Sequence, residues 1–510
     1  MSILSLHDLS GCHVLGLLLV GLVSAAAVRV VRNVYLHPLS QFPGPWYAAA
    51  TSLTSAIVSW RRMEPEWLLG LTKKYGTESP IRIAPTMLLF PRPSALKDIY
   101  WDPALNQKTE LYGTGVLGPP HLFSTRDGEV HRRLRKALGG THWSIGYLKN
   151  NWEHRIDDQV RLFEEKMTQF AERKEVIVLS DKVAEFAADI MTMVSFSEPW
   201  GFVQHSRDER RLLESWRGGL DFFGVAARWR WFRQNVLAND RLSGFFLPSG
   251  NDQSGMGYLY AQADRQVGLR EARMAAEGKS YYMERPDLLQ HCLDARYDSG
   301  APLTPVEKRA HVTLLIQAGA DTTATALSST LRYLLAQDGG RVLAEARAEL
   351  EAADRAGQLS DPVAYEEARR HLPYFGACIK EALRLQPPAT NFFGRLTRSS
   401  KTIDGALVPP ATEVTSNAYV VQRDPVLYAP DPETYRPERW LEGATPGRPR
   451  WRRRSSSSAS GPAEVAAMEL WKLLPQVVRR FDMQLLAVGE YTVAGGVAYN
   501  RGFEVRLTRR

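Results

Sequence analysis

The stretch that decides the fold runs from Thr304 to Gln337 and reads TPVEKRAHVTLLIQAGADTTATALSSTLRYLLAQ. Its start carries three helix signals: Thr304 can cap the first turn, Pro305 suits the first helical position, and Glu307 can complete a capping box. No obvious breaker follows before residue 338, so we expect one helix of about 48 Å, at about 1.5 Å per residue. Its middle is apolar or small on all sides, which predicts burial through the centre of the protein.

Inside this helix lies the motif AGADTT, residues 318–323. A glycine and a charged side chain are unusual in a buried helix. In one interpretation, small residues open the helix, and the Asp321 carboxyl and the Thr322 hydroxyl face a cavity, where they relay protons to a bound oxidant. In the other, Thr322 bonds back to the carbonyl four residues earlier and Asp321 sits in a buried ion pair. The residues alone leave both interpretations open.

A second helix is expected from about Tyr374 to Leu385. Glu381 and Arg384 are spaced i, i+3 on one face of it, and such pairs are usually surface contacts worth about a few tenths of a kcal/mol. Downstream, YRPERW at 435–440 supplies Arg439. Arg439 could join the pair as a buried triad that fixes a loop to the helix by bidentate hydrogen bonds.

A pair of basic residues, His131 and Arg135, is spaced i, i+4 in the sequence HRRLRK. Two cationic donors one turn apart suit a pair of carboxylates. A solvated basic face explains the same pattern and is favoured when the pair is taken in isolation. A third helix is expected near Val465 to Phe481 from its i, i+3, i+4 apolar spacing. Short strands are expected at 81–83 and 87–90.

The N-terminal segment Gly11 to Val28 is almost uniformly apolar, and Arg29 and Arg32 follow it. Its length is at the short end for a membrane span. A cleaved signal peptide is the alternative, with Ala25-Ala26-Ala27 as the cleavage site, but the positive charges follow the apolar run and favour an anchor with a cytosolic C-terminal side. We therefore expect a lumenal N-terminus at 1–10, a transmembrane anchor at 11–31, a Pro/Gly hinge at 32–50 and a single catalytic domain at 51–510.

The composition excludes several classes of protein. Net charge is +8, yet no basic stripe interleaved with aromatic residues appears, which argues against nucleic acid and for an anionic membrane face or an acidic partner. The three cysteines, Cys12, Cys292 and Cys378, are too far apart in sequence for a disulfide framework or a zinc site. GTGVLG at 113–118 matches a dinucleotide pattern, but Pro119-Pro120 follows it, which predicts a loop.

The FPGP turn at 42–45, the AGADTT helix, the EALR helix and PERW, in this order, resemble the cytochrome P-450 family, particularly its membrane-bound fungal members. The resemblance covers nearly the whole chain. It implies a mainly α fold with small β-sheets, holding heme between the central helix and the helix near residue 470. It also implies a heme-dependent monooxygenase that uses O2 and electrons from a separate NADPH-dependent flavoprotein reductase. The substrate would be a lipophilic small molecule of secondary metabolism, and the chain would sit in the endoplasmic reticulum membrane, in contact with membrane lipid.

The resemblance also implies roles for individual residues. Asp321 and Thr322 would serve oxygen activation and proton delivery. Heme propionates would be held by His131, Arg135 and Arg395. The structural triad would be Glu381, Arg384 and Arg439. The substrate pocket is expected to include parts of Tyr112 to Phe123, Leu314 to Thr322 and Thr390 to Phe393, whose character suits a moderately bulky apolar ligand.

One part of the chain departs from the family. The family signature F-x-x-G-x-R-x-C-x-G is absent, and counting back from Glu469 places Ser460 at the cysteine position, inside an Arg/Ser-rich tract at 441–464. A cysteine thiolate favours O–O cleavage on the iron, and a serine hydroxyl is a poor substitute. None of the three cysteines present is expected to replace it. Two explanations remain open: an error in the gene model, or a real substitution that leaves an inactive membrane-anchored binding or scaffold protein.

Overall fold

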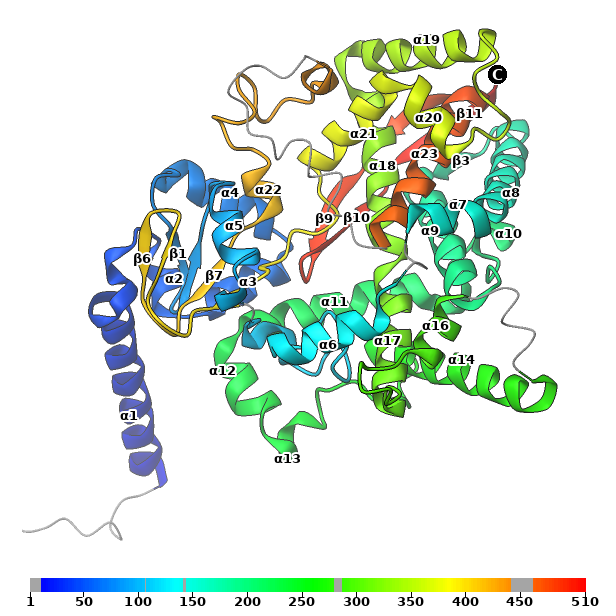
Figure 1. Ribbon diagram of the computed structural model, residues 1–510. Helices are drawn as coiled ribbons and strands as arrows, with labels where there is room; N and C mark the ends of the chain where they lie inside the picture. Colours follow the sequence, from blue (N-terminus) through cyan, green and yellow to red (C-terminus); the bar gives the residue numbers. More distant parts are fainter. Residues whose placement is uncertain (1–10, 106, 141–143, 279–286, 442–461) are drawn as a thin grey trace, which may run out of the picture.

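A computed structural model of the chain describes residues 11–105, 107–140, 144–278, 287–441 and 462–510. Helices predominate and small sheets lie at the edges (Figure 1), which confirms the mainly α fold class. The helices up to the centre of the chain are α1 (Gly11–Val31), α2 (Trp46–Ala50), α3 (Leu53–Trp60), α4 (Glu64–Tyr75), α5 (Ala95–Tyr100), α6 (Gly128–Leu138), α7 (Ile145–Asn151), α8 (Glu153–Glu172), α9 (Leu179–Phe196), α10 (Phe202–His205), α11 (Leu212–Arg228), α12 (Arg230–Phe232), α13 (Asp240–Ser243), α14 (Gly255–Glu277) and α16 (Leu288–Asp294). The later ones are α17 (Pro305–Ala318), α18 (Ala320–Ala336), α19 (Arg341–Arg355), α20 (Tyr365–His371), α21 (Pro373–Leu385), α22 (Ala418–Val421) and α23 (Pro462–Arg480).

The central helix begins as the sequence predicts. Thr304 Oγ1 accepts a hydrogen bond from the Glu307 backbone N–H at 3.2 Å, and Glu307 Oε2 accepts from the Thr304 N–H at 2.8 Å. The expected single helix is interrupted at Gly319, between α17 and α18. Gly319 keeps right-handed helical backbone angles, and α9 packs closely against it, since a Cβ added there would lie 2.4 Å from the Cγ atom of the buried Met191.

The helix α18 runs through the middle of the molecule (Figure 1) and packs against α9, α21, α23 and strand β10. Its Leu327, Leu331 and Leu334 are fully buried. They belong to the largest cluster of buried apolar side chains, which also draws on α8, α9, α21 and α23. Burial on all sides of α18 agrees with its apolar sequence, and it fixes the position of every residue that the helix carries.

Small β-sheets flank the helices. The strands are β1 (Ile81–Ala84), β2 (Met87–Leu89), β3 (Val176–Val178), β4 (Arg395–Leu396), β5 (Lys401–Ile403), β6 (Ala406–Val408), β7 (Glu413–Thr415), β8 (Phe481–Ala487), β9 (Glu490–Ala494), β10 (Val497–Arg501) and β11 (Glu504–Arg509). The order β1-β2-β7-β4 forms one sheet near the N-terminus, β3-β11-β8 forms another, and β9/β10 and β5/β6 are hairpins. Strand β2 pairs parallel with β7, and the other pairs are antiparallel.

The expected elements appear with small shifts. The helix predicted from Tyr374 to Leu385 is α21, and the one predicted from Val465 to Phe481 is α23, which starts at Pro462 and continues through Pro475. The segment 113–118 follows a short 3₁₀ turn and neither follows a strand nor opens a helix, so it lacks the context of a dinucleotide site. Residues 442–461, with most of the Arg/Ser-rich tract and Ser460, lie outside the described residues.

The N-terminal helix α1 extends away from the body (Figure 1), and its apolar side chains from Leu15 onward are exposed. A span at Leu15–Leu36 is long and apolar enough to cross a membrane. The hinge that follows is fastened to the first sheet, because the Arg82 N–H donates to the Pro43 carbonyl at 2.7 Å. A Cβ at Gly44 would lie 2.3 Å from the Arg82 carbonyl oxygen, so this close approach requires glycine.

We predict that Gly319→Ala lowers the free energy of unfolding by about 1–3 kcal/mol, because the added methyl group forces Met191 or the backbone of α9 to shift. The matched control is Gly268→Ala at an exposed position of α14 with no atom within 4 Å of the new Cβ. We expect that change to be neutral or to stabilise by up to about 1 kcal/mol. Chemical denaturation followed by circular dichroism measures both. Equal effects of the two changes would contradict the packing argument.

Candidate active site

Basic side chains from three segments gather beside α6. Lys108 lies in the loop before it, His131 and Arg135 are on α6 itself, and Arg395 is on β4, where its backbone bridges to that of Lys108. Burial, together with the charges of Lys108, Arg135 and Arg395, lowers the pKa of His131 to about 4. Within the described ranges none of these four side chains forms an ion pair with a carboxylate. The cluster therefore carries positive charge that the described protein does not neutralise.

The most buried member of this cluster is Lys108, which is 8% exposed. Its Nζ donates to the carbonyl oxygens of Leu122 at 3.1 Å and Phe123 at 2.7 Å and lies over the Tyr112 ring. Burial and the charge of Arg395 lower the pKa of Lys108 to about 7. Sequence reasoning missed Lys108 because a single lysine in a loop carries no pattern. Such a buried ammonium group lacks an anion to balance its charge.

Two of the three residues predicted to hold the heme propionates are more buried than the third. His131 and Arg395 are half-buried, whereas Arg135 is exposed. The Nη1 of Arg395 donates to the carbonyls of Phe393 at 3.3 Å and Gly394 at 3.2 Å, which holds its guanidinium in place. The two carboxylates of a heme match this charge, since cationic donors from separate elements surround one region. The residues present thus fit the anionic edge of that cofactor.

The acid on the central helix has a partner that the sequence did not reveal. Arg217 on α11 donates from Nη2 to Asp321 Oδ1 at 2.7 Å and from Nε to Oδ2 at 3.1 Å. The Asp321 side chain is 1% exposed. Burial disfavours the charged form of Arg217, but the Asp321 carboxylate outweighs this effect and raises the pKa of Arg217. The two residues are 104 positions apart, so nothing local in the sequence links them.

The hydroxyl next to this acid bonds within its own helix. Thr322 Oγ1 donates to the Ala318 carbonyl at 3.0 Å, which is the back-bonded arrangement weighed from the sequence. Asp321, in turn, sits in the buried ion pair that the same interpretation foresaw. Both side chains are therefore held by contacts within the protein. Thr322 is half-buried, so part of its side chain remains accessible.

The predicted triad residues lie together in the core. Glu381 Oε2 accepts from Arg384 Nε at 2.9 Å, and Glu381 Oε1 accepts from Arg439 Nε at 2.7 Å. All three side chains are at most 1% exposed. Trp440 Nε1 adds a hydrogen bond to the same carboxylate at 2.8 Å. Burial raises the pKa of Glu381, but the two guanidinium groups outweigh it and the net pKa is lowered. The loop that ends in PERW is thereby fixed to α21.

The iron side of a heme has no ligand among the described residues. Cys292 and Cys378 are free and buried, and burial raises the pKa of the Cys292 thiol to about 12 and that of Cys378 above its ordinary value. A thiolate ligand needs the opposite shift. The described residues hold no group of three or more His, Cys, Asp or Glu side chains that could bind a metal. Ser460, at the expected cysteine position, falls in the undescribed segment.

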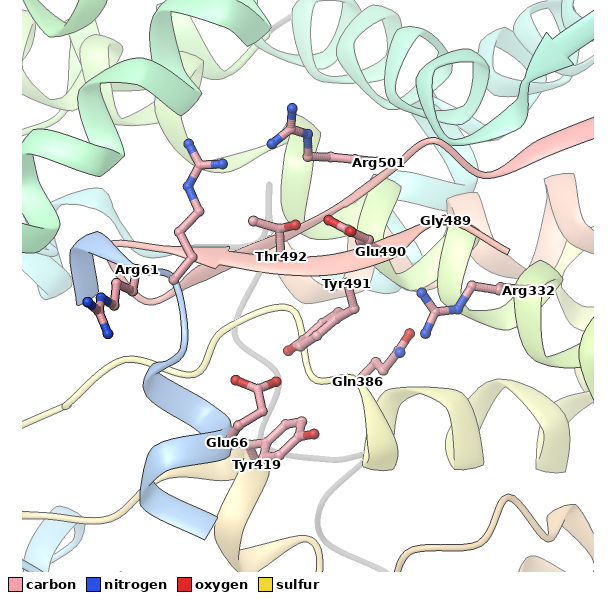
Figure 2. Close-up of a pocket in the computed structure, with 11 residues that line it drawn as sticks. Arg61, Glu66, Arg332, Gln386, Tyr419, Gly489, Glu490, Tyr491, Thr492 and Arg501 are labelled. Atoms are coloured by element: carbon pink, nitrogen blue, oxygen red, sulfur yellow. The ribbon is translucent and has the colours of Figure 1, made fainter. Parts of the chain in front are cut away.

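A polar cavity of about 470 Å³ opens beside the second half of α18. Figure 2 shows Arg332 and Gln386 on one side of it and Tyr491, which extends down from strand β9, to their left. Four arginines and two glutamates contribute to its lining, so it suits water or polar groups better than an apolar ligand. Neither described cavity is lined by the segments 112–123, 314–322 or 390–393 that the sequence suggested for a substrate pocket.

Comparison with known proteins places these features in context. The family model for cytochrome P-450 matches residues 112–490. The chain is 29% identical to the cytochrome P-450 monooxygenase gsfF of Penicillium aethiopicum, with 98% of this chain and 99% of that protein covered. It is also 29% identical to quiannulatic acid synthase of Emericella variicolor over 84% of each chain. A pisatin demethylase of Fusarium vanettenii is 26% identical, with 88% of this chain and 85% of the relative covered.

We predict that Arg217→Met lowers the free energy of unfolding by about 3 kcal/mol, because it leaves the buried Asp321 carboxylate without a partner. The double variant Arg217→Met/Asp321→Asn removes the uncompensated charge and should recover most of that loss. Urea denaturation of the two variants and of Asp321→Asn completes a double-mutant cycle. Additive effects, with no coupling between the two positions, would show that the ion pair does not form.

We expect a pH dependence from Lys108, whose pKa falls from 10.5 to about 7 on folding. Between these values the unfolded chain binds the proton and the folded chain does not, so stability rises with pH by about 1.4 kcal/mol per unit. The contribution of Lys108 to stability is complete above pH 10.5 and is lost as the pH falls to 7. Unfolding of heme-free wild type and Lys108→Met is compared across this window. Parallel curves would mean that Lys108 keeps its proton in the fold.

Proposed function

This chain belongs to the cytochrome P-450 family, and from that premise we propose that it inserts one oxygen atom from O2 into a lipophilic small molecule of secondary metabolism. The family consists of heme-dependent oxidoreductases, and the relative from Penicillium aethiopicum is named a monooxygenase. Two further relatives are named quiannulatic acid synthase and pisatin demethylase, and each name specifies one compound. Such names support a role on a dedicated small molecule.

The observation that carries the proposal is the basic cluster of Lys108, His131, Arg135 and Arg395, which has no carboxylate partner among the described residues. Burial and the neighbouring positive charges lower the pKa of Lys108 and His131, so a ligand with carboxylates bound there would favour their protonated forms. Heme has two carboxylates and is the cofactor of the family. His131, Arg135 and Arg395 would hold them, as the resemblance implies, and the buried ammonium of Lys108 adds a fourth donor. When bound, the heme supplies oxygen activation.

The residues on α18 are proposed to handle protons. Asp321 is oriented by its hydrogen bonds from Arg217, and Thr322 is the next residue on the same helix. To donate its proton to a ligand, the Thr322 hydroxyl must rotate out of its bond to the Ala318 carbonyl. A proton must then return to Thr322 from solvent water, and the Asp321 carboxyl would relay it by taking a proton from water and passing it on once Arg217 releases one of its bonds.

The cellular setting is also a proposal. The span Leu15–Leu36 supports a single-pass anchor, and the arginines within and after it favour a cytosolic body on the endoplasmic reticulum membrane. A lipophilic substrate concentrates in the same bilayer. A separate NADPH-dependent flavoprotein reductase would deliver the electrons, and the net charge of +8 favours docking of an acidic partner.

A specific observation favours a second function. The sequence carries serine at position 460, and Cys292 and Cys378 are buried thiols whose pKa values burial raises. Without a thiolate the chain would lose the electron donation that O–O cleavage needs. The same fold would then act as a membrane-anchored binding or scaffold protein. The triad, the acid–hydroxyl pair and the cationic cluster are all intact, which favours the monooxygenase.

We expect the transcript to encode F-x-x-G-x-R-x-C-x-G between the codons of Trp440 and Glu469. The full-length protein should then show the absorption of a thiolate-ligated, CO-bound reduced heme. Cys378→Ser is the matched control, since that buried thiol lies on α21 and should leave the spectrum unchanged. If sequencing returns the Arg/Ser tract and the spectrum lacks the thiolate signature, the monooxygenase proposal fails and the binding role replaces it.

A further inference from the structure

A second cavity of about 420 Å³ lies where α1 joins the body, away from the cationic cluster. Its walls come from the segment after α1, the FPGP turn, α2 and β1. We call it the junction pocket and define it by Val34, Ser40, Phe42, Trp46, Ala49 and Arg82. Four of these side chains are apolar, and Arg82 is the charged one. A pocket of this kind suits a ligand with an apolar body and an anionic group.

The guanidinium of Arg82 lacks an anion. Arg82 is 2% exposed, and its Nη2 donates to the Pro85 carbonyl at 2.8 Å, while its Nε is buried and has no hydrogen-bond partner. Arg82 forms no ion pair with any residue that the structure describes. Burial lowers its pKa. An arginine left in this state is unfavourable unless an external anion pairs with it, and its planar donors match a phosphate group.

Other bases extend the positive charge around the pocket. Burial and the guanidinium groups of Arg82, Arg32 and Arg230 lower the pKa of His37, which places these groups near one another. Arg230 Nη1 donates to the Thr86 hydroxyl at 2.9 Å, and that hydroxyl in turn donates to Glu413 at 3.1 Å. Glu413 is therefore bonded to Thr86 and not to Arg82. The junction keeps net positive charge.

The position of the pocket indicates which anion it would bind. The 21 residues of α1 span about 32 Å, which is close to the apolar thickness of a bilayer, so its C-terminal end reaches the headgroup layer. The junction pocket begins at that end. Tyr35 and Trp46 are 73% and 68% exposed beside it, and aromatic side chains of this kind gather at membrane interfaces. Lipid phosphates are the anions at this depth.

We propose that the junction pocket binds one anionic glycerophospholipid, with Arg82 donating to its phosphate and the apolar walls contacting the start of its acyl chains. The proposal rests on the membrane anchorage proposed above. The lipid would fix the angle between α1 and the body, because its binding site contains Val34, which lies in the hinge close to the end of α1, and Arg82 in β1.

The test uses the full-length chain in nanodiscs of phosphatidylcholine with a minor share of phosphatidylserine. Native mass spectrometry after release from the nanodisc counts the phosphatidylserine molecules that stay bound. Wild type should retain one. Arg82→Gln removes the charge, and Ser40→Trp fills the pocket from an exposed position, so it tests the site even if Arg82→Gln fails to fold. Each should lower retention about tenfold, the effect of losing one charge-assisted contact.

The matched control is Arg61→Gln, an equal charge change at an exposed arginine after α3 and outside the junction pocket. It should retain the lipid as wild type does. Retention by both Arg82→Gln and Ser40→Trp would overturn the proposal, as would displacement of the lipid by inorganic phosphate at equal concentration. Release of the chain from membranes by carbonate would overturn the anchorage itself. Lipid retention does not depend on heme, so a missing thiolate spectrum leaves this result unaffected.

Discussion

The structure depends most on one buried carboxylate, Glu381, and the two guanidinium groups that pair with it. Three charged side chains lie in the core with at most 1% exposure, and removal of Glu381 would leave two buried guanidinium groups without a carboxylate. Arg439 comes from a segment 58 residues away, so the ion pairs close a long stretch of chain. That stretch also contributes backbone carbonyls to Arg384 and Arg439. The chain on the N-terminal side of the Arg/Ser-rich tract is therefore anchored before the tract begins.

The sequence predicted the fold well where local chemistry decides it. The capping box at Thr304, the extent of α21 and the apolar spacing of α23 were predicted to within a few residues. The break at Gly319 was foreseen only in the interpretation in which small residues open the helix, and its close packing on Met191 of another helix gave no local signal. Arg217 and Lys108 were missed for the same reason. Arg217 lies 104 residues from Asp321, so no local sequence spacing links the two. Lys108 is a single lysine in a loop and belongs to no repeating pattern.

The two halves of the cofactor site differ in how complete they are. Bases from three segments would meet the anionic edge of a heme, as proposed, whereas the two free cysteines among the described residues are buried with raised pKa values. These are separate requirements, since charge compensation needs only cations nearby and a thiolate ligand needs one sulfur at one place. The cluster is retained although the signature cysteine is absent from the sequence, and the proposed chemistry requires that cysteine.

The hydrogen bond from the Arg82 N–H to the Pro43 carbonyl, with Gly44 pressed against the same strand, has a consequence for how substrates arrive. A stiff joint prevents the body from tumbling freely about its tether. With α1 in the bilayer, as proposed, a body held at one inclination would present the same flank to the bilayer at all times. Compounds dissolved in the lipid would then approach by lateral diffusion in two dimensions, with the membrane as their reservoir.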